Sequence, residues 1–269
     1  MTGRTHTKAL LLVTSSTPLS TRARIIWTAA LLFLWWLVAQ SGTVSTLIIP
    51  HPLDVATAAA NIGWRLLEHV AATLLRTGIG YVFGLFLGVA FGFLAQYSAA
   101  AQKVLVPFFD AARPVPAIAV LPVFILLFGF SETGRVLLIA LSTGVFIATA
   151  TIEAIAKIPE PWTRFARVSG LSRAGIYREV LTWGCIPFLL GPSRLALALA
   201  FTLTIAAEFM GAQSGLGYLI NTARVNLAIP TVWLAILLIG IISLAFDMVV
   251  VQSFRKATDW YRGAEKLGA

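Results

Sequence analysis

Residues 77–97 read TGIGYVFGLFLGVAFGFLAQY, and their composition points to a membrane protein. No charged residue occurs between Arg76 and Lys103, and a helix needs roughly 17–25 mostly apolar residues to cross a bilayer. Glycines recur at four-residue intervals within the stretch, at Gly80, Gly84, Gly88 and Gly92. Such a series lets another helix approach closely inside a membrane. We therefore expect a spanning helix whose glycine ridge packs within the chain, with a subunit interface as the alternative.

The composition of the whole chain excludes a soluble globular protein. Of its 269 residues, 58% are hydrophobic and 12% are charged, whereas a soluble domain has about 25% charged residues. A net charge of +9 is typical of nucleic-acid binding, but it also arises when Lys and Arg gather in the cytoplasmic loops of a membrane protein. We therefore expect a lipid bilayer and no nucleic acid as the partner.

Hydropathy predicts an all-α integral membrane protein with about six transmembrane helices. The first is preceded by Arg22 and Arg24, so a cleaved signal peptide is an alternative to a retained helix, which we favour. Residues 54–70 look amphipathic and are expected to lie on the outer surface before the second span. The spans are expected near residues 25–40, 77–97, 115–130, 136–152, 187–210 and 231–254.

The distribution of basic residues predicts the orientation. With six spans both termini lie on one side, and fourteen of the twenty Lys and Arg residues fall on that side, against three on the other. The positive-inside rule therefore places the terminal tails, residues 1–24 and 255–269, in the cytoplasm. It also makes residues 157–184 the largest cytoplasmic loop.

Prolines and acids interrupt the apolar segments. Pro107, Pro114, Pro116 and Pro122 cluster before and within the third span, and a helix broken at membrane depth is tolerated only inside protein or beside a cavity. The segment that contains Pro114, Pro116 and Pro122 is therefore expected to form either a re-entrant turn or a flexible gate. Glu208 and Asp247 lie in or near spans. We expect structural pairing rather than proton coupling for them, and we keep Glu208 as a possible pathway residue.

The chain shows no arrangement that suits catalysis. The glycine-rich residues 211–217 lack the Lys-Ser/Thr of a P-loop, and the motif G-x-x-x-x-G-K-[ST] is absent from the sequence. A single cysteine, Cys185, and three histidines without ligand spacing give little support to a metal site. We therefore expect no catalytic residue, no metal and no cofactor on this chain.

The loop 157–184 carries the most specific pattern. Residues 163–169 are expected to form a short helix that stops at Gly170, and Ser172 is expected to cap a second helix over residues 173–181. The basic residues share one side and Phe165, Ile176 and Tyr177 the other. This pattern favours a docking surface for a partner over a merely solvated basic loop.

These residues also carry a resemblance to a known family. The run Ala166-Arg-Val-Ser-Gly-Leu-Ser-Arg173, followed by Ile186-Pro187, resembles the EAA loop of ABC-importer permeases, the inner-membrane components of binding-protein-dependent transport systems. Leu121-Pro122 with Leu127-Phe-Gly129, and Glu208 followed by Ser214-Gly-Leu-Gly-Tyr-Leu219, are similar to the nitrate/sulfonate/taurine branch. The resemblance extends from about Ile48 to Phe254.

The resemblance implies a type I ABC-importer permease in the bacterial inner membrane. Such a permease works as a pair, here a homodimer, with two ATPase subunits that bind ATP and Mg and with an extracytoplasmic binding protein. It would move a small solute such as a sulfonate, taurine or nitrate inward. A stand-alone secondary carrier or channel is the alternative, and it would need polar residues in register along a pore. The ATPase-docking residues implied are Arg164, Phe165, Ala166, Arg167, Gly170, Leu171, Ser172 and Arg173.

Two departures from the family pattern fall in this loop. Arg164-Phe165-Ala166 stands where the pattern has Glu-Ala-Ala, and Val180-Leu-Thr-Trp183 stands where Ile-x-Leu-Pro is usual. A cation thus replaces an acid at one expected contact, and the partner ATPase should differ correspondingly.

Overall fold

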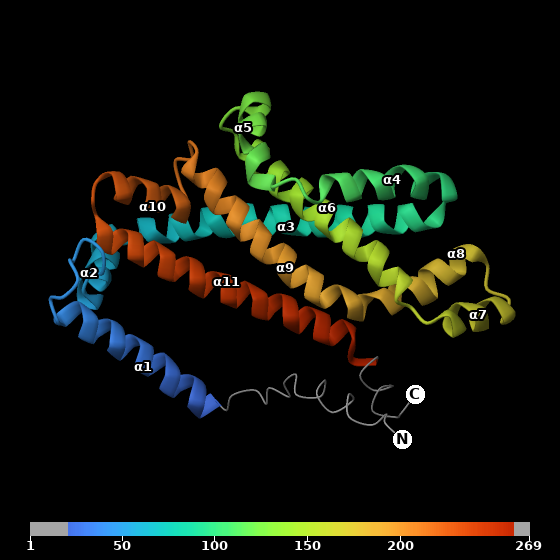
Figure 1. Cartoon of the computed structure of the whole chain (residues 1–269), viewed down its shortest axis with the longest axis horizontal. Helices are drawn as coiled ribbons and strands as arrows, with labels where there is room; N and C mark the ends of the chain where they lie inside the picture. The colour runs from blue at the N-terminus through green and yellow to red at the C-terminus, as the bar shows by residue number, and fades with distance from the viewer. Residues whose placement is uncertain (1–20, 261–269) are drawn as a thin grey trace, which may run out of the picture.

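The computed structural model describes residues 21–260, in which every regular element is a helix. The expected tails lie outside the described residues at positions 1–20 and 261–269. In chain order the elements are α1 (Thr21–Gln40), α2 (Pro52–Ile62), α3 (Arg65–Tyr97), α4 (Ala99–Ala112), α5 (Ala117–Phe128), α6 (Glu132–Ala156), α7 (Glu160–Val168), α8 (Arg173–Gly175), the π-helical turn η2 (Ile176–Leu181), α9 (Thr182–Phe209), α10 (Leu216–Val225) and α11 (Ile229–Ala257) (Figure 1).

Four helical stretches within the described residues are long and apolar enough to cross a membrane: α3, α6, the run Arg173–Phe209 and α11. The pair α4 and α5 adds a fifth if it is counted as one broken span. The apolar part of α1, Ile26–Gln40, is shorter than these. The expected number of about six therefore depends on how α1 and the broken pair are counted.

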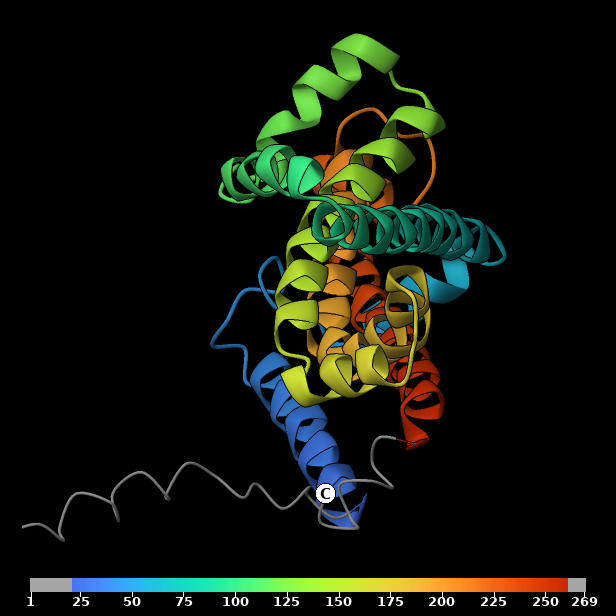
Figure 2. The same cartoon turned by 90° about the vertical axis from the view of Figure 1, so that its right-hand side faces the viewer.

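The third expected span, residues 115–130, contains only the 12-residue helix α5, which is shorter than the roughly 17–25 residues that a spanning helix needs. α4 and α5 meet at an angle of 101°, and α5 projects from the rest of the bundle (Figures 1 and 2). Pro114 and Pro116 lie at the break. A proline has no backbone N–H to donate, so these residues interrupt the helical hydrogen bonds between α4 and α5.

The second span begins earlier than hydropathy indicates. α3 starts at Arg65 and has 33 residues, which correspond to about 50 Å of helix. Residues 54–70, which were expected to lie on the outer surface, are therefore divided between α2 and the start of α3. Gly63 at φ +62° follows the end of α2, and it separates α2 from the first turns of α3.

The glycine ridge of α3 lies against α6 of the same chain. A Cβ atom at Gly84 would lie 2.6 Å from the carbonyl oxygen of Ala140, and one at Gly88 would lie 2.6 Å from that of Gly144. The backbones of the two helices therefore approach so closely that only glycine fits at these positions.

Apolar side chains of α3, α6, α9 and α11 form the main core around Ile139, Ile147 and Phe201. Thr77 and Thr204 are paired inside it, whereas the buried hydroxyl groups of Thr143 and Ser193 have no partner among the described residues. The Thr77 hydroxyl donates to Thr204 Oγ1 at 2.9 Å, as buried polar groups require. This core holds the two ends of the bundle in fixed positions relative to each other.

Candidate functional site

The bundle has two polar ends, each with a distinct arrangement of charged residues. In Figure 1, α7 and α8 lie at the right-hand end, and α2 and α10 lie at the left-hand end. Because α3, α9 and α11 run between these ends, the two arrangements face opposite sides of the membrane that the bundle is expected to span.

α7 is a short amphipathic helix that presents apolar side chains to the outside. Ala166 is buried, whereas Phe165 is 75% exposed and Val168 is 83% exposed. The Arg164 guanidinium donates to Glu160 Oε1 at 2.9 Å, one helical turn away. Glu160 in the first turn and Arg167 in the last both suit the helix dipole. The helix is therefore locally well formed, although the described residues leave one of its faces uncovered.

A Schellman motif ends α7. The Leu171 N–H donates to the Ala166 carbonyl and the Gly170 N–H donates to the Arg167 carbonyl, both at 3.1 Å. This pattern requires a left-handed residue, and Gly170 has φ +83°. The Ser172 side chain then accepts a hydrogen bond from the Gly175 N–H at 3.2 Å and caps the next helix. The expected helix stop and cap thus have the geometry that their residue types predict.

The second helix of the loop does not end at Leu181 as expected. Helical structure continues through α8, η2 and α9, so residues Arg173–Phe209 form one stretch of 37 residues. The first turns of a membrane-spanning helix therefore make up the second half of the loop, and only the residues around Gly170 separate α7 from that helix.

Side chains that were expected to face a partner instead contact α3. The Arg173 guanidinium lies 5.1 Å from the ring centre of Tyr97 and donates to the Tyr97 carbonyl. The Tyr177 hydroxyl donates to the Gln96 carbonyl. Ile176 and Tyr177 are also partly buried against a core cluster. These contacts fasten the loop to the end of α3 and leave Phe165 as its main exposed aromatic residue.

An apolar hollow adjoins α7. Its volume is about 870 Å³, and Trp183 on its wall is 53% exposed. The residues around it come from α7, the turn after it, η2, α9 and the C-terminal end of the described chain, among them Trp162, Phe165, Leu171, Val180, Trp183 and Trp260.

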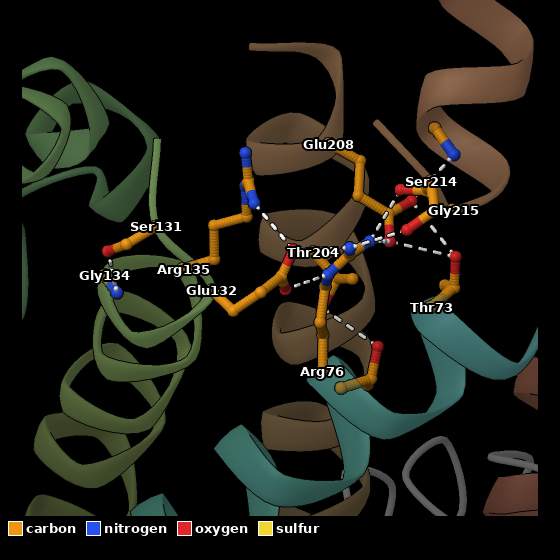
Figure 3. A network of polar contacts seen from close by, with 12 residues as sticks. Thr73, Arg76, Ser131, Glu132, Gly134, Arg135, Thr204, Glu208, Ser214 and Gly215 are labelled. Carbon is orange, nitrogen blue, oxygen red and sulfur yellow. Dashed lines mark hydrogen bonds and ion pairs between the residues drawn. The ribbon is translucent and has the colours of Figure 1, made fainter. Parts of the chain in front are cut away.

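The opposite end holds a network of charges centred on the buried Arg76 (Figure 3). The Arg76 Nε and Nη2 groups donate to the two oxygens of Glu132 at 2.6 and 2.7 Å. Its Nη1 donates to Glu208 at 2.8 Å and to the Ser214 carbonyl at 2.7 Å, and its Nη2 also donates to Ser214 Oγ at 3.0 Å. All five N–H donors that a guanidinium possesses are thus used.

Glu208 is 1% exposed and is fully surrounded by donors. Besides Arg76, it accepts from the Thr73 hydroxyl at 3.0 Å and from the Gly217 N–H at 2.8 Å. A Cβ atom on Gly215 would overlap its carboxylate. The glycines of the 211–217 segment therefore let the backbone close over the Glu208 carboxyl group, and this residue does not line an open pathway.

Arg135 extends the network to the start of the same loop. It donates to Glu132 Oε1 at 2.9 Å and to the Gly211 carbonyl at 2.8 Å. The network thereby ties α3, α6 and α9 to residues 211–217. The sequence indicated pairing for Glu208 but not its partners, although Arg76, Glu132 and Arg135 all stand at the ends of apolar stretches.

The break between α4 and α5 borders a second hollow, of about 600 Å³. Pro114 and Pro116 lie on its wall with Phe124, Leu199 and Thr202. Pro122 belongs to α5 itself. At the same break Arg113 donates to Glu153 of α6 at 3.2 Å. Irregular backbone and a charge thus coincide, as expected beside a cavity or a second protein surface.

Comparisons with known proteins agree with this architecture. Residues 80–258 match the family described as "Binding-protein-dependent transport system inner membrane component". The chain is 30% identical to the taurine transport system permease protein TauC of Escherichia coli, with 87% of each chain covered.

Two further matches extend the comparison. The chain is 29% identical to the aliphatic sulfonates transport permease protein SsuC of Bacillus subtilis, over 88% of this chain and 87% of that protein. Among solved structures, a chain of the inward-facing MetNI methionine ABC transporter superposes with a TM-score of 0.65 at 20% identity. That match covers 74% of this chain and 98% of the other, and it shows a shared fold.

Proposed function

Because the chain belongs to the family of binding-protein-dependent transport system inner membrane components, we propose that it is the permease subunit of an ABC importer for a small sulfonate-like solute. Its relatives TauC and SsuC belong to the taurine and aliphatic sulfonate branch. The proposed assembly contains two copies of this chain, two separate ATPase subunits that bind ATP and Mg, and an extracytoplasmic binding protein.

The exposed surface of α7 is the observation that supports this proposal most strongly. Its exposed Phe165 and Val168 give a partner an apolar contact that water does not favour. Its Arg164 and Arg167 add positive charge beside that contact. We assign this surface to the ATPase, and this places α7 and both termini in the cytoplasm, in agreement with the distribution of basic residues.

Motion of α7 would be passed directly to the membrane-spanning helix that follows it in the chain. The Schellman turn at Gly170 joins α7 to the helical stretch Arg173–Phe209, and Arg173 and Tyr177 hold the start of that stretch on α3. A movement of the ATPase subunits would therefore shift α9 and α3 together. A partner shifts the equilibrium between two conformations of the permease only by binding those conformations with different affinities. The ATP-bound and ATP-free ATPase must therefore bind α7 differently.

The network end would then face the binding protein. The 211–217 segment is held by Arg76, Arg135 and Glu208, which gives an incoming protein a rigid surface. Rigid loops bind with a smaller loss of conformational entropy than mobile ones.

Replacing Gly170 by valine is expected to lower ATP-driven uptake about tenfold while membrane insertion persists. A left-handed conformation costs a residue with a Cβ atom about 1–2 kcal/mol, and a β-branched side chain tolerates it least. No atom lies within 4 Å of a Cβ at this position, so the effect would come from the turn and not from a collision.

Gly170→Asn is the matched control, because asparagine adopts left-handed conformations more readily. Both variants would be reconstituted with the ATPase and binding protein, and labelled taurine uptake would be measured alongside the amount of permease in the vesicles. Equal uptake by the valine variant and the wild type would remove the turn at Gly170 from the coupling path.

A further inference from the structure

An ion pair lies deep within two membrane-spanning helices and remains accessible at the surface of the chain. Arg194 of α9 donates from Nε to Asp247 Oδ1 at 2.7 Å and from Nη2 to Oδ2 at 2.8 Å. The Arg194 side chain is 52% exposed and that of Asp247 is 26% exposed. The pair is therefore bidentate, yet about half of the Arg194 side chain is not covered by the described residues.

Both members of the pair lie inside apolar stretches, and Asp247 stands about 10 Å of helix before the end of its stretch at Phe254. Arg194 precedes the end of α9 at Phe209 by about 22 Å of helix, and Asp247 follows the start of α11 at Ile229 by about 27 Å. They are the only charged residues within 180–207 and 225–254. Charges at this depth cost a few kcal/mol in contact with lipid, and they normally face protein or a water-filled cavity.

The exposed face of α9 connects the pair with the hollow at the α4–α5 break. A separate hollow of about 670 Å³ surrounds the pair and includes Gly191 and Ala198. One turn further along, Leu199 and Thr202 line the hollow beside Pro114 and Pro116. Exposed residues thus continue along one face of α9 from the ion pair to the broken helix, and small side chains recur on that face.

We propose that this face of α9 lines the water-filled pathway and that Arg194 is the residue that recognises an oxyanion group of the passing solute. The inference rests on the proposed permease function and names its substrate class. The planar guanidinium matches the paired oxygens of a sulfonate as well as those of a carboxylate.

The geometry of the pair suits transient binding. Within the described residues no acceptor faces Arg194 Nη1, since its hydrogen bonds leave from Nε and Nη2. A solute anion can bind at the free edge of the Arg194 guanidinium while Asp247 binds the edge formed by Nε and Nη2. Asp247 also neutralises Arg194 in the empty pathway and competes with the solute, which keeps binding weak enough for release.

Cysteine labelling of the full chain in membranes tests the proposal without transport. The native Cys185 is buried and would be replaced by alanine, and Ala198→Cys would then place a thiol near the pair. Methanethiosulfonate reagents that carry a sulfonate or a trimethylammonium group would be compared. We expect the sulfonate reagent to react about tenfold faster, because the free edge of the Arg194 guanidinium can donate hydrogen bonds to its oxygens, and Arg194→Gln to abolish or reverse the difference.

Phe86→Cys on α3 is the control, since Phe86 is 71% exposed in a stretch without charge and should face lipid and react with neither reagent. Failure of Ala198→Cys to react would show that lipid or another protein surface covers the face, and it would overturn the pathway assignment. Equal rates for the two reagents would overturn the role of Arg194. Failure of the proposed permease function would be distinguishable: wild-type complexes would then be labelled as expected but would show no ATP-driven uptake.

Discussion

Replacing Glu208 by alanine is expected to destabilise the folded chain by about 3–5 kcal/mol, because it leaves a buried charge without its partner. Arg76 is 6% exposed and would lose the hydrogen bond from Nη1 to Glu208. The Thr73 hydroxyl and the Gly217 N–H would lose their acceptor as well. The loop 211–217 should loosen together with the ends of α3 and α9.

Thermal denaturation of the purified chain in detergent would measure this effect. Glu160→Ala is the control, since it removes an exposed ion pair with Arg164 and should change stability by about 0–1 kcal/mol. The double variant Arg76→Leu/Glu208→Leu should be less harmful than Glu208→Ala, because it leaves no unpaired charge between the two positions. Equal stability of Glu208→Ala and Glu160→Ala would contradict the structural role of the network.

Replacing Gly88 by valine is expected to separate α3 from α6. The first added carbon would lie 2.6 Å from both the Gly144 carbonyl oxygen and Ile147 Cβ. Neither a backbone carbonyl nor a β-branched side chain can move aside locally. Overpacking of this kind costs about 1–3 kcal/mol or more, and here it acts on the most extensive helix contact of the bundle.

Gly240→Val on α11 makes the same chemical change where no atom lies within 4 Å of the new Cβ. Both variants would be compared with the wild type for the yield of monodisperse protein and for resistance to limited proteolysis. We expect the Gly88 variant to lose both and the Gly240 variant to keep them. A Gly88 variant that resists proteolysis as well as the wild type would show that the glycine ridge is not needed for close packing.

The features that local sequence encodes could be predicted. Composition alone identified the membrane class, and the spacing of the α3 glycines identified a packing face. Gly170 and Ser172 could be placed because helix caps depend on residue type and on neighbours within a few positions.

Features that depend on distant residues could not be predicted in this way. Arg76 meets Glu132 and Glu208 across 56 and 132 residues, and no periodicity in the chain records such a pairing. The contacts of Arg173 and Tyr177 with α3 likewise required the folded arrangement. The prolines predicted a break before α5. The angle of that break could not be predicted, because it depends on how α5 packs against other helices.

ATP-driven uptake by the reconstituted complex tests the central claim most directly. Proteoliposomes would contain this chain with or without a candidate ATPase subunit, with ATP inside and binding protein and labelled taurine or an alkanesulfonate outside. We predict uptake only when the ATPase and ATP are both present. Uptake by this chain alone, at a rate that ATP and the ATPase do not change, would contradict the account and favour a stand-alone carrier or channel.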